Sequence, residues 1–219
     1  MEAPSSQLPT GTVTFLFSDI EDSTRLVENL GTSVYRDLIE QHHRLLREVF
    51  DRTGGVERGT AGDGFLVVFT DASSAVKAAV EAQRSIHDSP WPGGGVVRVR
   101  IGLHSGQGTR GGDDYVGSDI NRAARVASAA HGGQTLISDS TRALCERSLP
   151  DEVAILYVGE YRLKGLDGPE RLYQLIIDGL PSDFPPPRAT AVGAVHVPGR
   201  MTSFVGRRGE AVANSATAR

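Results

Sequence analysis

The sequence predicts an α+β sandwich, in which an antiparallel-rich sheet carries helices on one of its faces. Strand-like and helix-like segments follow one another in a mixed order, without the strict alternation of a parallel α/β fold. Two apolar runs flank the pair Asp63-Gly64, which favours a tight turn between antiparallel strands. A Gly-rich polar stretch over residues 105–115 predicts a second, protruding hairpin.

The composition is that of a globular domain with a tail, and it excludes several functions. The chain has 219 residues, 39% of them hydrophobic and 23% charged, which is enough for one sizeable core. A net charge of −4 argues against a nucleic-acid or acidic-membrane binder. We find no apolar run of membrane-spanning length and no signal-peptide pattern in MEAPSSQLPTG, so we expect a cytoplasmic protein. A membrane segment elsewhere in a longer chain stays open, and the lone Cys145 supplies neither a disulfide nor a zinc site.

The rest of the chain is organised around residues 12–25. Residues 12–17 are β-branched and aromatic, which predicts a strand buried on both faces. Asp19 follows where this strand ends, and Asp22, Ser23 and Thr24 are candidate N-caps for a helix. Carboxylates can hold hard cations and free helix amides can hold phosphate. A turn-forming Asp at a strand end is also common, so this stretch alone leaves both interpretations open.

The next segments read as structural elements. Residues 32–53 predict a helix with an apolar stripe. No acid or Cys stands at ligand spacing from His42 and His43, so we expect them to be solvated or at the edge of the core. A helix over residues 71–86 is capped by Asp71, and a loop follows over residues 90–95.

Two polar features mark the second half of the chain. The predicted strand over residues 96–104 turns Arg98 and Arg100 to one face, and a charged face on a central strand needs a partner or a ligand. The predicted helix over residues 118–130 carries Asn121 and Arg125 four residues apart, and therefore on one face. The same pair would also suit a solvated helix edge.

The remaining segments close the domain. A strand (134–138), a short helix (140–147), a strand (153–163), a loop (164–168) and a strand (172–177) are expected in that order. Beyond Gly179 the chain is rich in Pro and Ala, which is typical of a linker. We therefore divide it into an N-terminal extension (1–10), one domain (11–179) and a linker with tail (180–219). Residues 182–219 are expected to be either poorly ordered or docked on the domain.

Asp19 and Asp63 together predict more than either acid does alone. In an antiparallel-rich sheet the end of the first strand and the tip of the next hairpin can be neighbours, which would set Asp19 against Asp63. Paired carboxylates repel unless a cation neutralises them, so the pair predicts a site for divalent metal ions.

Five motifs taken in order resemble a known family. FSDIEDST, GTAGDGFLVVF, VRIGLHSG, DDYVGSDINRAARV and LKGLDGPERLYQL are similar to the motifs of the class III nucleotidyl cyclase catalytic domain, most of all its bacterial, actinobacterial branch. The resemblance covers roughly residues 11–177. It implies a ferredoxin-like, palm-type sheet and a head-to-tail homodimer with two sites at the interface.

The resemblance also implies roles for individual residues. Two Mg²⁺ or Mn²⁺ ions would be held by Asp19, Asp63 and the Ile20 carbonyl of one protomer. The phosphates of the substrate would be held by the amides after Asp19 together with Thr24, Arg100 and Lys164. Asn121 and Arg125 of the other protomer would orient the ribose and stabilise the transition state.

The chain departs from the family at the base-reading positions. Adenine is usually read by a lysine four residues before the second metal acid and an acid seven residues before the Asn. Asp114 supplies the acid, but the lysine position is Gly59. Arg58 is adjacent, and strand alternation points it to the opposite face unless Gly59 introduces a bulge. A weakly active or poorly selective site is therefore expected.

Two classes of function remain. The first is a metal-dependent adenylate cyclase that converts ATP to 3′,5′-cyclic AMP, with a nucleoside triphosphate and a second copy as its partners and no nucleic acid or membrane contact. The second is a weakly active or non-catalytic nucleotide-binding and dimerisation module. Gly59 favours the latter, as does a tail segment, residues 201–207, that resembles the start of some signalling ATPase domains. GTP is the less supported substrate, because the base-reading positions lack the acid and small polar residue that guanine reading employs.

Overall fold

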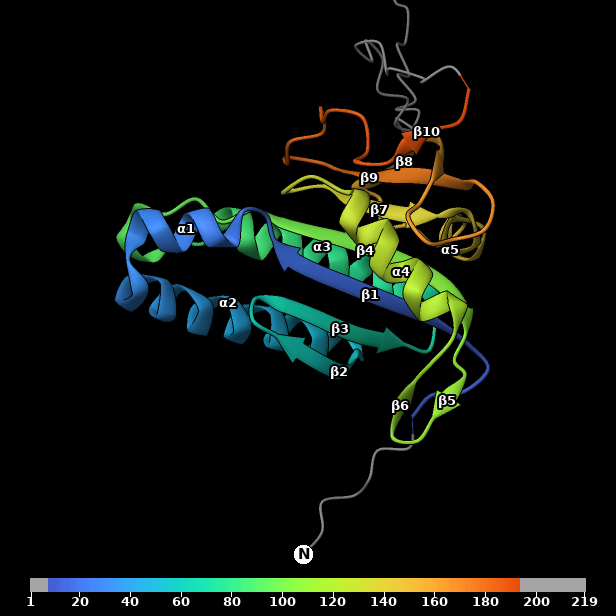
Figure 1. Ribbon diagram of the computed structural model, residues 1–219, viewed down its shortest axis with the longest axis horizontal. Coiled ribbons are helices and arrows are strands. Elements are labelled where there is room, and N and C mark those ends of the chain that lie inside the picture. Colours follow the sequence, from blue (N-terminus) through green and yellow to red (C-terminus); the bar gives the residue numbers. More distant parts are fainter. Residues whose placement is uncertain (1–7, 194–219) are drawn as a thin grey trace, which may run out of the picture.

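The computed structural model describes residues 8–193, which form one eight-stranded sheet with flanking helices (Figure 1). The strand order is β10-β8-β9-β7-β4-β1-β3-β2, and every neighbouring pair is antiparallel except β4 and β7. The strands are β1 (Thr12–Ile20), β2 (Val56–Ala61), β3 (Gly64–Phe69), β4 (Val99–Gln107), β7 (Thr135–Ser138), β8 (Val153–Arg162), β9 (Glu170–Ile177) and β10 (Thr190–Ala191). The predicted antiparallel-rich α+β fold is confirmed.

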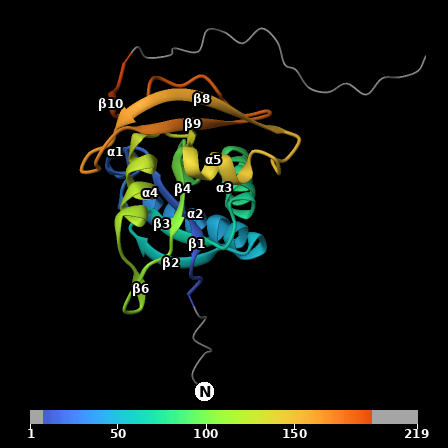
Figure 2. The same cartoon turned by 90° about the vertical axis from the view of Figure 1, so that its right-hand side faces the viewer.

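Five α-helices pack on this sheet, and they cover both of its faces, so the expectation of one covered face is wrong. They are α1 (Ser23–Leu30), α2 (Thr32–Thr53), α3 (Ala72–Asp88), α4 (Ser118–Ala129) and α5 (Asp139–Cys145). Figure 2 shows α4 on one side of the central strands β1 and β4, with α3 and α5 on the other. Leu16 packs in the core under α2 and α3, whereas its neighbour Phe15 packs on the α4 side. A central strand that is apolar on both faces needs helices on both.

Gly102 in β4 is what allows α4 to lie so close to the sheet. A Cβ at this position would come within 2.2 Å of the Ala127 backbone nitrogen. Only glycine permits this approach, because no relaxation of a flexible side chain could relieve a clash with backbone.

The predicted boundaries are mostly confirmed, with one shift in β4. This strand begins at Val99, three residues later than expected, because its ladder with β1 starts at the pair Ile20 and Val99 and runs to Thr12 and Gln107. The Gly-rich stretch forms a separate two-stranded hairpin, β5 (Arg110–Gly111) and β6 (Asp114–Tyr115), which projects from the body (Figure 1). A short 3-10 helix, η1 (Pro92–Gly94), lies in the loop before β4.

The first part of the linker is docked on the domain, as one of the two expected outcomes. Residues 180–193 run back over the sheet and end in β10, which pairs with the outer edge of β8. The tail segment 201–207 and most of the N-terminal extension lie outside the described residues. Within residues 8–193, no helix has the length and apolar character needed to cross a membrane.

Candidate active site

The two predicted metal acids meet at one end of the sheet. Ser18 pairs with Phe65 in the ladder of β1 and β3, so the tip of the hairpin between β2 and β3 lies beside the end of β1. The Ile20 amide donates a hydrogen bond of 2.7 Å to Oδ2 of Asp63. Burial raises the pKa of Asp19; Arg100 works in the opposite direction, and the nearby charge of Asp63 adds to the rise. The structure therefore places Asp19 and Asp63 within electrostatic reach of each other.

Arg100 is the direct partner of Asp19. The two residues face each other in the ladder of β1 and β4. Arg100 Nε lies 2.6 Å from Asp19 Oδ1, and Nη2 lies 2.7 Å from Oδ2, so the fork of the guanidinium holds both carboxylate oxygens. This accounts for the charged face on a central strand. The role of Arg100 as a phosphate contact remains a prediction.

The residues present fit a hard divalent cation. Two carboxylates and the Ile20 carbonyl are oxygen donors, which Mg²⁺ and Mn²⁺ prefer. A carboxylate offers about four lone-pair positions, so Asp19 can accept from Arg100 and still ligate. Residues 8–193 contain no group of three or more His, Cys, Asp and Glu placed to hold a metal, so a site here depends on two acids, backbone and water.

The segment after Asp19 leads into free helix amides. Asp22 has a left-handed backbone with φ of 53° and is the N-cap of α1, but its side chain makes no capping hydrogen bond. The first amides of α1 therefore stay available to an anion. Thr24 is exposed in the first turn of this helix, where its hydroxyl can add to such a site.

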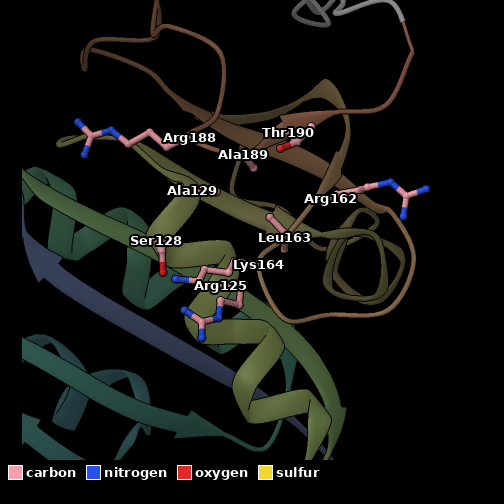
Figure 3. A pocket seen from close by; sticks show the side chains of 9 residues that line it. All are labelled: Arg125, Ser128, Ala129, Arg162, Leu163, Lys164, Arg188, Ala189 and Thr190. Carbon is pink, nitrogen blue, oxygen red and sulfur yellow. The ribbon is translucent and has the colours of Figure 1, made fainter.

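A second group of candidate residues lines a different part of the surface. Asn121 and Arg125 are exposed on α4, while Ala123 and Val126 of the same helix are buried. Arg125 lines a cavity of about 570 Å³ together with Ser128, Ala129, Arg162, Leu163, Lys164, Arg188, Ala189 and Thr190. Figure 3 shows Arg125 and Lys164 converging on one side of it, whereas Arg162 and Arg188 point away from them. Asn121 lies one turn earlier on α4, outside the cavity lining.

The start of α4 is fixed by a network of partly and fully buried side chains that the sequence did not single out. Asp119 Oδ2 accepts a hydrogen bond of 2.7 Å from the Gln107 amide, and its Oδ1 lies 3.5 Å from His104 Nε2. His104 is buried, and burial lowers its pKa to about 4, so the imidazole is neutral. Its Nδ1 lies 2.8 Å from the Ser138 hydroxyl. This network ties the helix that carries Asn121 and Arg125 to β4 and β7.

Arg58 lies at an irregularity of β2, beside the predicted base-reading position Gly59. The ladder of β2 and β3 shifts register between Glu57 and Gly59, which makes Arg58 the extra residue of a β-bulge. Arg58 Nη2 donates to the Asp113 carbonyl, and its Nε lies 3.7 Å from Asp114 Oδ1. The Nε atom is buried and has no hydrogen-bond partner among residues 8–193. A Cβ on Gly59 would have nothing within 4 Å.

The family described as the adenylate and guanylate cyclase catalytic domain matches residues 6–177. The chain belongs to this family. An uncharacterized protein of Mycobacterium tuberculosis is 36% identical over 205 residues, which are 92% of this chain and 69% of the relative. An adenylate cyclase structure from Trypanosoma brucei, in its monomeric state, has a TM-score of 0.73 and 28% identity over 84% of this chain and 96% of that one. The guanylate cyclase domain of a Catenaria anguillulae protein in complex with GTP has a TM-score of 0.69 and 26% identity over 76% and 96%.

These findings confirm the expected family, and the mycobacterial relative agrees with the expected actinobacterial type. The chain is thus a class III nucleotidyl cyclase domain. Both adenylate and guanylate cyclases occur among the similar proteins, so the comparisons leave the choice of base open.

Proposed function

We propose that this chain is a metal-dependent adenylate cyclase, which converts ATP to 3′,5′-cyclic AMP and diphosphate as a homodimer. One observation carries the proposal. Asp19 lies at the end of β1 and Asp63 in the neighbouring turn between β2 and β3, whereas neither acid lines the cavity with Arg125 and Lys164. Each chain therefore holds two complementary half-sites. A two-fold, head-to-tail pairing would set the acids of one copy against the cations of the other and would complete two sites.

The reaction forms one phosphorus–oxygen bond and breaks another. The ribose 3′-oxygen attacks the α-phosphorus, the bond from that phosphorus to the oxygen bridging to the β-phosphate breaks, and diphosphate leaves. The proton of the 3′-hydroxyl passes to solvent. Two divalent ions, held by Asp19, Asp63 and the Ile20 carbonyl, would lower the pKa of that hydroxyl and offset charge at the α-phosphate.

The remaining residues position the triphosphate and the ribose. Lys164 and Arg125 converge in the cavity and supply fixed positive charge for phosphate oxygens (Figure 3). Asn121, one turn earlier on the same exposed face of α4, is placed to orient the ribose. Preorganised donors of this kind contribute about 3–4 kcal/mol each to the transition state. Thr24 and the uncapped amides of α1 would hold the outer phosphates.

The bulge in β2 supports adenine as the base. In a bulge of this kind the extra residue and the next one point to roughly the same side, so Arg58 reaches the side that the usual lysine would occupy at Gly59. Arg58 supplies a cationic donor for the adenine ring nitrogen, and Asp114 an acceptor for the 6-amino group. Guanine presents an N–H at the ring nitrogen and a carbonyl at position 6, so it would set a donor against Arg58 and an acceptor against Asp114.

A nucleotide-binding and dimerisation module, weakly active or in the extreme case non-catalytic, is the second candidate. Gly59 in place of the usual lysine favours it, as does the fork of Arg100, which occupies both oxygens of Asp19. Such a module would bind ATP with Mn²⁺ but release no cyclic product.

The test is to incubate the purified chain with ATP or GTP and Mn²⁺ or Mg²⁺ and to resolve the products by chromatography. We expect cyclic AMP, in excess over cyclic GMP, and none from Asp19→Ala. Nucleotide binding by a folded dimer without any cyclic product would refute the enzyme and favour the module.

A further inference from the structure

The segment after the last strand of the domain passes over the active-site end of the molecule. We call residues 180–193 the C-terminal strap. Its first part is fixed through side chains of the domain: Gln174 Nε2 donates 2.8 Å to the Ser182 carbonyl, and His131 Nε2 lies 3.0 Å from the Pro186 carbonyl. Pro187 is buried. The C-terminal strap is therefore bound to the domain through several contacts.

The strap then joins the wall of the phosphate cavity. The Arg188 amide donates 2.8 Å to the carbonyl of Ala129, the last residue of α4. Thr190 and Ala191 pair with β8, and the Val192 amide donates 2.8 Å to the Glu160 carbonyl. Residues 188–190 line the cavity that also contains Arg125 and Lys164 (Figure 3).

Arg188 also reaches the metal end of the molecule. Its guanidinium pairs with the carboxylate of Glu21, the residue after Ile20. The Glu21 side chain is only 15% exposed, and its Oε2 lies 2.6 Å from where a Cβ on Gly132 would be. The Glu21 amide donates 2.9 Å to the Arg98 carbonyl. Glu21 thus packs between the start of β4 and the loop that follows α4, and Arg188 pairs with its carboxylate.

We propose that Arg188 is a positioning residue, which acts through Glu21 to fix the metal loop, defined as residues 19–24. The loop supplies Asp19, the Ile20 carbonyl and the first amides of α1, so its backbone must be held for ions and phosphates to meet their ligands. The catalytic consequence rests on the proposed function, whereas the coupling between strap and loop does not.

The ion pair between Arg188 and Glu21 should contribute more to the stability of the loop than a fully exposed pair would. Fully exposed pairs contribute little, because water screens them and the side chains lose freedom. Here the acid is largely buried and its backbone is part of the loop, so loss of the cation leaves a largely buried carboxylate without its partner. We expect effects of about threefold to tenfold on the properties of the loop.

The first experiment needs no turnover. Hydrogen exchange of the full-length chain, without metal, should show faster exchange at the amides of Glu21 and Leu26 in Arg188→Ala and in Glu21→Gln, by about fivefold. Arg171→Ala is the matched control, because Arg171 forms an arginine–glutamate pair of 2.9 Å with Glu160 at the same edge of the sheet, away from the loop. It should leave both amides unchanged.

The second experiment measures metal binding and activity. Mn²⁺ binding by electron paramagnetic resonance and the Mg²⁺ dependence of turnover should both weaken about fivefold in Arg188→Ala, with ATP/GTP preference unchanged. Arg188→Lys should recover part of the loss. The double variant with Glu21→Gln should be no worse than the poorer single variant, because both act through one contact.

The outcomes separate the two proposals. Faster exchange and weaker Mn²⁺ binding without any cyclic product would support the positioning role while refuting the cyclase. Unchanged exchange in Arg188→Ala, or losses that multiply in the double variant, would overturn the positioning role whatever the enzyme does.

Discussion

Replacement of Arg58 by alanine tests how the site reads its base. The variant removes a cationic donor whose Nε is buried, lacks a partner and lies 3.7 Å from Asp114. A lost charged hydrogen bond costs about 1.5–3 kcal/mol, which corresponds to a roughly ten- to hundredfold fall in kcat/KM for ATP. Guanine would place its own ring N–H against this group, so kcat/KM for GTP should change by less than about twofold.

The assay compares kcat/KM for both nucleotides in the wild type and the variant, alongside melting temperature. Arg58 also donates to the Asp113 carbonyl, so a small loss of stability is expected. Arg47→Ala is the control. Arg47 pairs with Glu57 of the same strand at 2.8 Å, so its loss should disturb β2 without touching the base site. Arg58→Lys keeps the charge and should retain most of the ATP preference.

A second variant makes the reasoning refutable. A side chain at Gly59 would meet open space, so Gly59→Lys in the Arg58→Ala background should restore about 1–2 kcal/mol of ATP preference. If Arg58→Ala melts like the wild type and leaves the ATP/GTP ratio unmoved, neither position reads the base and the bulge has no role in selectivity.

Asp19→Ala should abolish turnover at an unchanged melting temperature, and equal rates for this variant and the wild type would refute the metal assignment. The wild type should be more active with Mn²⁺ than with Mg²⁺, because Mn²⁺ tolerates imperfect ligand geometry. Asp19→Ala and Arg125→Ala should each be inactive, but a mixture of the two should recover about a quarter of wild-type activity after subunit exchange, because half the dimers would carry one intact site of two. No recovery despite proven exchange would mean that both residues serve a site within one protomer. Burial lowers the pKa of His42 to about 3, so in the folded state it resists protonation below its ordinary pKa of 6.5, and stability falls as the pH drops from 6.5 towards 3. Urea unfolding should show that wild type loses about 2 kcal/mol more than His42→Leu between pH 7 and pH 5; equal losses would contradict this.

Local patterns sufficed for most of the fold. The Asp71 cap was predictable because a side-chain acceptor before an apolar periodicity has few alternatives, and its carboxylate does accept from the Ser74 amide at 2.8 Å. The face covered by α4 was not predictable in this way. It depends on Gly102, where an added Cβ would lie 2.2 Å from the backbone nitrogen of Ala127, 25 residues later in the chain. No periodicity within either segment reports such a distance.

A residue of the candidate site was predictable wherever its type and its spacing in the sequence were enough to place it. Asp19 and Asp63 could be paired in advance because strand order and a hairpin tip bring them together, and the hydrogen bond from Ile20 agrees with that arrangement. The roles of Asp119 and Arg188 could not be anticipated. Their partners, the Gln107 amide and Glu21, are distant in sequence and are selected by tertiary packing alone.

The position of the usual lysine shows why a motif can mislead when residues are assigned only by counting along the sequence. Counting back from Asp63 reaches Gly59, and strict alternation then sends Arg58 to the far face. The register shift between Glu57 and Gly59 removes that alternation for one residue. Without a side chain of its own, Gly59 leaves the space beside the bulge free, and Arg58 turns towards Asp114. A lysine at position 59 would instead set two cations against one carboxylate. We therefore expect Arg58, together with the open space at Gly59, to take the place of the usual lysine, and the Arg58→Ala and Gly59→Lys variants test this expectation.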